Sequence, residues 1–201
     1  MRKELSYFTI EHSYGGNQSW FRDPMMKLGG CGAATACDSC ICLGLYKEKE
    51  SLYPYDLRKL SKEDYIRFAM KMKPYLRPRM QGINTLELFI DGFNQYLSEL
   101  GAGSIQLEAF SIEHTLDSAK EIIRQQIDLK LPIPYLLLRH KSYSMKDLVW
   151  HWFLVIGYEE FEDEFYIKIA TYGNYRWLSL KELWNTGYSE KGGMVLIRDN
   201  S

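Results

Sequence analysis

The sequence predicts an α+β fold, in which a largely helical first half packs on an antiparallel β-sheet from the second half. Segments that carry helix-capping signals occupy most of the first half, and segments rich in β-branched and aromatic residues dominate the second half. The length of 201 residues suits a single domain, 1–201, because typical domains hold roughly 100–200 residues.

Four helices are expected before the main group of strands. The first follows a glycine pair and consists of small and apolar residues, and the second lies between a serine N-cap and a proline. The third begins with a capping box and ends at a glycine, and the fourth is amphipathic. These helices are Cys31–Tyr46, Ser61–Lys73, Asn84–Gly101 and Thr115–Lys130.

Five strands are expected, each enriched in β-branched and aromatic residues. A short helix that starts at Ser179 should lie between the last two. The strands are Ser104–Ser111, Ile133–Arg139, Trp150–Tyr158, Glu164–Thr171 and Gly193–Arg198.

The charge balance excludes several classes of partner. Lys and Arg number 25 against 26 Asp and Glu, so no excess positive charge favours nucleic acid or anionic lipid. The N-terminus lacks the apolar stretch of a signal peptide, and the apolar runs are far shorter than the ~20 residues that span a bilayer. We expect a cytoplasmic protein with neither a nucleic-acid nor a membrane partner, and the sequence leaves the oligomeric state open.

The four cysteines all fall within one expected helix, which argues against disulfides in a reducing compartment. At 100° per residue, Cys37 and Cys40 lie about 60° apart on that helix, whereas Cys42 points about 160° away from Cys40. These three thiols do not converge on one ion, and no second Cys/His cluster completes a tetrahedral site. We therefore expect buried structural thiols and neither a metal nor another cofactor.

Cys31 differs from the other cysteines because it opens its helix within Gly29-Gly30-Cys31-Gly32. The positive end of the helix dipole should lower the thiol pKa and favour the nucleophilic thiolate. Gly30 would let the backbone approach a substrate closely, and the Cys31 amide could face an oxyanion. The alternative interpretation is an inert core cysteine.

A thiolate nucleophile normally works with an imidazole base. Of the four histidines, His151 is the candidate, because it lies in an apolar strand while the others lie in polar or turn-like surroundings. A histidine that only satisfies the core is the alternative. Trp152, directly after it, is a candidate substrate contact.

Gly30-Cys31-Gly32-Ala33-Ala34 at a helix start, followed about 120 residues later by a strand from His151 through Gly157-Tyr158, resembles papain-like cysteine peptidases, especially the bacteriocin-processing branch that cleaves after a double-glycine leader. The resemblance implies a papain-like fold, with the nucleophile helix packed on the sheet. It also implies a Cys31–His151 pair that hydrolyses a peptide or small amide.

The resemblance further implies two supporting residues. A glutamine ahead of the nucleophile serves as oxyanion donor, and Gln18 is the only glutamine before Cys31, although its spacing of 13 residues is long. Residues 22–27 would then loop out as an insertion. The family also places an Asp or Asn on the strand after the histidine, where this chain offers Thr171 or Asn174.

The missing Asp keeps two other functions open. One is a catalytically silent papain-like protein that binds a peptide or partner in the same cleft. The other is a Cys–His acyltransferase, because cleft shape and water access decide whether water or an amine accepts the acyl group.

Overall fold

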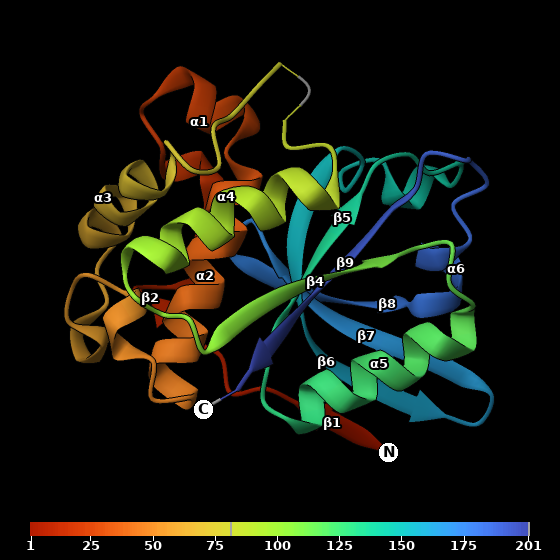
Figure 1. The fold of residues 1–201 in the computed structure, drawn as a ribbon. Coiled ribbons are helices and arrows are strands. Elements are labelled where there is room, and N and C mark those ends of the chain that lie inside the picture. The colour runs from red at the N-terminus through yellow and green to blue at the C-terminus, as the bar shows by residue number, and fades with distance from the viewer. Residues whose placement is uncertain (81, 201) are drawn as a thin grey trace.

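The computed structural model describes residues 1–80 and 82–200, and within them an antiparallel seven-stranded sheet lies between two groups of helices (Figure 1). The helices are α1 Pro24–Gly29, α2 Cys31–Tyr46, α3 Lys62–Met72, α4 Leu86–Glu99, α5 Leu116–Asp128 and α6 Leu180–Trp184. The strands are β1 Arg2–Glu4, β2 Thr9–Ile10, β3 Ser13–Tyr14, β4 Ile105–Ser111, β5 Ile133–Leu137, β6 His151–Phe161, β7 Glu164–Thr171, β8 Asn174–Ser179 and β9 Gly192–Asp199. The α+β prediction is confirmed.

The sheet has the order β4-β9-β5-β6-β7-β8, and β1 pairs with the far end of β6. The separate pair β2 and β3 forms a small hairpin. Because β6 is central, its first residue is held by β5 on one side, where Leu137 pairs with His151. The long β6–β7 hairpin brings the end of β7 back to that residue.

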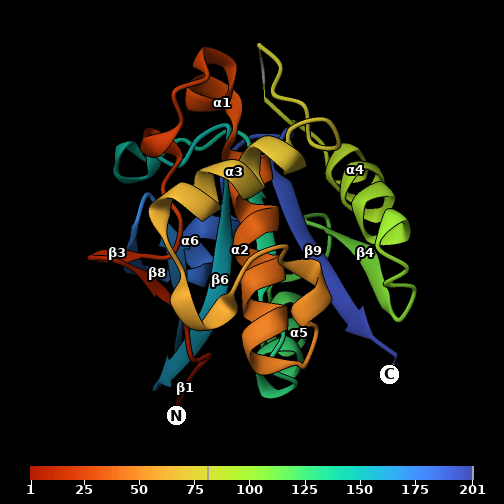
Figure 2. The same ribbon diagram turned by 90° about the vertical axis from the view of Figure 1, so that its left-hand side faces the viewer.

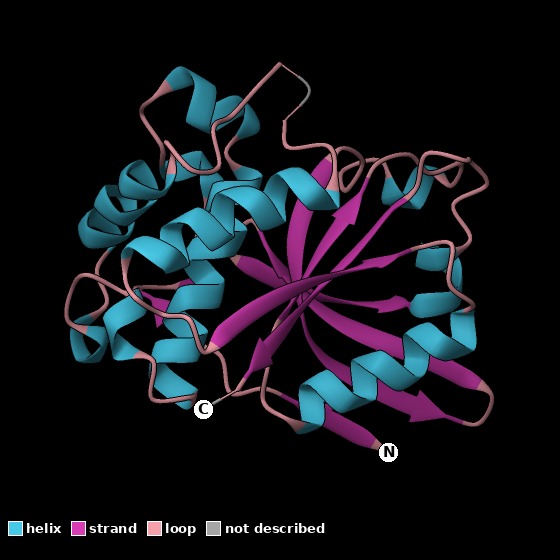
Figure 3. Ribbon diagram, viewed as in Figure 1, coloured by secondary structure: helices cyan, strands magenta, loops and turns pink. Residues whose placement is uncertain are grey.

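Helices cover both faces of the sheet. In Figure 1, α1 to α4 gather on one side of the strands, and α5 and α6 lie on the other; Figure 3 shows the same layers coloured by type of structure. Leu136 and Trp152 belong to the core shared with α2 and α4, whereas Tyr135 and Phe153 belong to the core shared with α5 and α6. This alternation reflects the two-residue period of β-strands. Figure 2 shows α2 and α3 standing in front of the sheet.

The helix starts follow the capping signals of the sequence. The side chains of Ser61, Thr85, Thr115 and Ser179 each accept a hydrogen bond from a backbone N–H three residues further on. The four predicted helices and the short helix after Ser179 are confirmed, with α2 covering the predicted range. The cap of α4 is Thr85 rather than Asn84, so that helix begins one residue later than the capping box suggested.

Several elements were missed, among them α1, β1, β8 and the short β2–β3 hairpin. Residues 22–27 do not loop out, because Pro24 begins α1 and the Asp23 carboxylate accepts from the Met26 N–H at 2.9 Å. β1 has three residues, too few to show a periodic pattern, and β8 contains no β-branched residue, so neither segment was among the expected strands. The order of helices first and strands second is thus incomplete, since β1 joins the sheet from the N-terminus.

The helices are short. The longest, α2, has 16 residues, fewer than the ~20 that cross a hydrocarbon core. Within residues 1–80 and 82–200, no helix combines the length and apolar character of a membrane span.

Candidate active site

Cys31 is the first residue of α2, at the point where α1 ends and the chain turns into the longer helix. Gly30 makes this junction possible, because a Cβ there would lie 2.3 Å from the Met26 carbonyl oxygen. Gly30 is buried against α1, so its contribution is close packing rather than the predicted contact with substrate. The glycine pair therefore fixes the position of the Cys31 thiol.

His151 is the first residue of β6, and the end of β7 supplies its partner. The His151 Nε2 and the Thr171 Oγ1 are 2.7 Å apart. Thr171 thus occupies the position in which the resemblance placed an Asp or Asn. Asn174 does not reach the ring: it is exposed at the start of β8, and its side chain accepts from the adjacent Tyr175 N–H at 2.8 Å.

Cys31 and His151 line the same cleft, which has a volume of about 670 Å³. Both also line a small pocket of about 20 Å³ that continues along α2. Cys31 is only 5% exposed and His151 only 6%, so a reagent reaches them through the cleft. The first residue of α2 and the first residue of β6 therefore line the same cleft, as the sequence predicted.

Burial raises the pKa of the Cys31 thiol above its ordinary value. The backbone N–H groups of Trp152, Gly32 and Cys31 itself act in the opposite direction but do not outweigh burial. The expectation of a lowered thiol pKa at the helix start is therefore wrong for the resting site, because desolvation exceeds the effect of the helix terminus. Those same N–H groups remain available to a charge that develops near the sulfur.

Burial also lowers the pKa of His151 to about 4. Asp147 acts to raise this pKa and Arg176 to lower it, and these two side chains pair with each other at 3.0 Å. His151 is therefore neutral at pH 7, with a lone pair that can accept a proton. The resting pair consists of a neutral thiol and a neutral imidazole.

Tyr172 covers one face of the His151 ring. The two rings are stacked with centroids 4.4 Å apart and planes inclined by 6°, and the Tyr172 hydroxyl donates to the Asp147 carbonyl oxygen at 3.2 Å. The hydroxyl also lies within hydrogen-bonding distance of His151 Nδ1, at 3.3 Å, and the near-parallel rings align this contact poorly with the in-plane lone pair of Nδ1. Tyr172 was missed as a partner of His151, although it directly follows Thr171.

Gln18 lies in a short 3-10 helix, Gln18–Trp20, and lines the cleft together with Cys31 and His151. Its Nε2 donates to the Lys27 carbonyl oxygen at 2.9 Å, which fixes the side chain and leaves a second N–H on the same nitrogen. The long spacing to Cys31 is taken up by α1. The predicted proximity of Gln18 to Cys31 is therefore found.

Trp152 offers the site only its backbone. Its indole is 1% exposed, stacks on Phe89 with centroids 4.3 Å apart and donates from Nε1 to the Ile83 carbonyl oxygen at 2.6 Å. A side chain so enclosed is a core anchor and not the predicted substrate contact. Its N–H, however, faces the Cys31 sulfur.

Asp38, which sequence reasoning missed, lies two turns beyond Cys31 on α2 and is buried. Its carboxylate accepts from the Tyr7 hydroxyl at 2.6 Å, the Tyr65 hydroxyl at 2.7 Å and the Gly16 N–H at 3.2 Å. Burial raises its pKa to about 6. Asp38 thereby connects α2 to the segment that contains Gln18. An aspartate in the middle of an apolar helix was the sequence feature that could have identified it.

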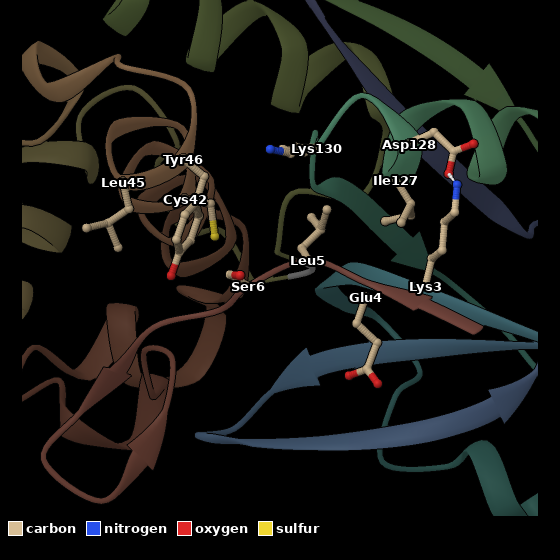
Figure 4. Close-up of a pocket in the computed structure, with 10 residues that line it drawn as sticks. All are labelled: Lys3, Glu4, Leu5, Ser6, Cys42, Leu45, Tyr46, Ile127, Asp128 and Lys130. Atoms are coloured by element: carbon tan, nitrogen blue, oxygen red, sulfur yellow. Dashed lines mark hydrogen bonds and ion pairs between the residues drawn. The ribbon is translucent and has the colours of Figure 1, made fainter.

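Cys37, Cys40 and Cys42 are buried free thiols, as predicted. Among the described residues, no three His, Cys, Asp or Glu side chains come together as metal ligands. Cys42 borders a separate cavity of about 560 Å³ between β1, the end of α2 and the end of α5 (Figure 4). The Lys3–Asp128 pair at 2.8 Å lies at its edge, and no histidine is among its lining residues. This cavity therefore lacks the base that acyl chemistry at Cys42 would need.

Comparison with models of known protein families finds no match to this chain. A search of curated proteins finds none either. The chemistry of the cleft itself is therefore the basis for a function.

Proposed function

We propose that the protein is a thiol-dependent amide hydrolase of the papain-like type. The observation that supports this most directly is the meeting of Cys31 and His151 in one cleft. Three further features agree with it: a neutral imidazole at His151, a second N–H on Gln18, and backbone N–H groups against the Cys31 sulfur.

In the proposed reaction, His151 Nδ1 takes the proton of the Cys31 thiol as the sulfur attacks the carbonyl carbon of an amide. The carbonyl π electrons move to oxygen and form a tetrahedral oxyanion. When the oxyanion collapses, the C–N bond breaks, and the imidazolium gives its proton to the leaving amine. Water, deprotonated by His151, then attacks the thioester. The C–S bond breaks, the Cys31 thiolate takes the proton back from the imidazolium, and the carboxylic acid is released.

Gln18 and the Cys31 N–H would donate to the oxyanion, whose charge exists only during the reaction. Thr171 would orient His151 by accepting from Nε2–H, which leaves Nδ1 as the basic nitrogen. A hydroxyl carries no charge, so it stabilises the imidazolium less than the Asp of the resembled family would.

The test is acylation with p-nitrophenyl acetate, followed by intact-mass and peptide mass spectrometry. We expect a transient acetyl thioester on Cys31, none in Cys31→Ala, and at least tenfold slower formation in His151→Gln. Cys37→Ala, which removes another buried thiol of α2, serves as the matched control and should keep the adduct. Acetylation of lysines alone, with Cys31 unmodified, would contradict the proposal.

A second candidate is a catalytically silent protein that binds a peptide in the same cleft. The raised pKa of Cys31 and the hydroxyl in place of a carboxylate beside His151 favour it. A stable complex with peptide amides that are not cleaved, together with an unreactive Cys31, would support this candidate. An added amine that captures the acetyl group from Cys31 faster than water does would indicate an acyltransferase instead.

A further inference from the structure

The cleft above Cys31 has an apolar rim. Four of its lining residues are large apolar side chains that remain exposed: Leu28, Met80, Trp150 and Tyr172. Leu28 is 69% exposed and Met80 88%. Exposed apolar side chains that are scattered singly need no explanation, but a group around one cleft indicates a binding surface.

Two of these residues are held in an unfavourable backbone conformation. Trp150 has a φ of 55° and Tyr172 a φ of 52°, in the left-handed region that bulky side chains rarely adopt. Such a conformation is unfavourable and persists where the surrounding structure enforces it. Here the Trp150 N–H donates to the Leu138 carbonyl oxygen at 3.0 Å, and Asn17 donates to the Tyr172 carbonyl oxygen at 3.0 Å.

Both strained residues flank His151, one directly before it in the chain and the other stacked on its ring. Tyr172 has its positive φ because it is the first central residue of the two-residue turn between β7 and β8, in which Thr171 pairs with Asn174 and Gly173 has a φ of 72°. Both aromatic rings nevertheless remain about half-exposed at the cleft, beside the proposed base, where a ligand group can contact them.

The charge of the cleft narrows the class of ligand. Its described lining contains one charged side chain, Lys27, and no carboxylate. A cationic group would therefore find no counter-ion there. A cleft of about 670 Å³ also has room for a bulky group.

We propose that the substrate carries a bulky apolar group, an aliphatic chain or an aromatic ring, close to the carbonyl that Cys31 attacks. This inference rests on the proposed function and adds the substrate class. The apolar group lies against Trp150 and Leu28, while the carbonyl oxygen points to Gln18.

The test compares the rates at which iodoacetamide and N-hexyl iodoacetamide alkylate Cys31, each normalised to its rate with free glutathione. Because burial of a few methylene groups stabilises a complex, we expect the hexyl reagent to react at least tenfold faster with Cys31 after normalisation. Trp150→Gly, which suits the positive φ, and Leu28→Ala should each lower this preference at least threefold. Phe161→Ala, which removes an exposed ring at the distant β6–β7 turn, is the matched control and should retain it.

The outcomes separate the two proposals. If Cys31 reacts rapidly with iodoacetamide in a manner that needs His151, but shows no preference for the hexyl reagent, the apolar substrate class is wrong and the thiol chemistry stands. A preference that Trp150→Gly and Leu28→Ala leave unchanged also overturns the inference. If Cys31 is as unreactive as Cys37 toward both reagents, the proposed function fails, and the substrate class fails with it.

Discussion

A negative charge at position 171 should convert the neutral Cys31–His151 pair toward an ion pair. Thr171 Oγ1 lies 2.7 Å from His151 Nε2, and threonine and aspartate are similar in size. Thr171→Asp would therefore place a carboxylate in hydrogen-bonding contact with an imidazole whose pKa burial has lowered to about 4.

An opposite charge at such a distance raises an imidazole pKa by roughly 1–3 units, so the His151 pKa should rise to about 5–7. This shift corresponds to about 1.4–4 kcal/mol in favour of the imidazolium. The thiolate is stabilised by the same cation, so alkylation of Cys31 by iodoacetamide at pH 6 should accelerate at least tenfold. The assay is NMR titration of the His151 ring protons, combined with the alkylation rate at each pH.

Two variants of the same position act as controls. Thr171→Asn keeps a polar group of similar shape without charge, and Thr171→Val keeps the shape without a hydrogen bond. Both should leave the His151 pKa near about 4. An unchanged His151 titration in Thr171→Asp, or an equal rise in Thr171→Asn, would refute the electrostatic reasoning.

Further predictions concern stability and the limits of the site. The folded-state pKa of His151, about 4, is below the ordinary 6.5, so the folded protein binds fewer protons than the unfolded chain between these pH values. The free energy of unfolding should therefore decrease by up to about 3 kcal/mol as the pH falls from 6.5 to 4. His151→Gln should not show this decrease in urea unfolding. Asp38 has the opposite effect, because its folded-state pKa of about 6 is above the ordinary 3.8. The free energy of unfolding should increase by up to about 3 kcal/mol as the pH falls from 6 toward 4, and Asp38→Asn should abolish this increase. If the pH dependence of unfolding is the same in Asp38→Asn, the assignment of a buried carboxylate is wrong. Trp152→Ala should lower the free energy of unfolding by about 3–5 kcal/mol, and a smaller loss in thermal or urea unfolding would show that the indole is not a core anchor. Asn174→Ala should leave the Cys31 alkylation rate unchanged. A severalfold decrease in this rate would show that Asn174 contributes to the reactivity of Cys31.

The helices and the central strands could be predicted well from the sequence, because the residues that indicate them act locally. Ser61 and Thr115 cap their helices through side chains that act within one turn, and the glycine before Cys31 marks the start of α2. β1 escaped prediction because three residues carry no period, and its pairing with the end of β6 depends on the whole sheet.

The site was predictable in its members but not in its electrostatics. Cys31 and His151 could be identified from a helix start and a strand that contains one histidine, and their proximity follows from the packing of α2 on β6. The thiol pKa could not be predicted, since burial depends on tertiary contacts that surround Cys31. The choice of Thr171 over Asn174 likewise depended on where β7 ends, which the pattern of the sequence leaves ambiguous by a few residues.

The proposed function depends most on the activation of one thiol, Cys31, by one imidazole, His151. The most direct measurement is the rate at which iodoacetamide modifies each cysteine at pH 7, resolved by peptide mass spectrometry in the wild type and in His151→Gln. We expect Cys31 to react at least tenfold faster than Cys37, Cys40 and Cys42, and we expect this difference to disappear without His151. Equal rates for all four thiols, or an advantage of Cys31 that persists in His151→Gln, would contradict the proposed function.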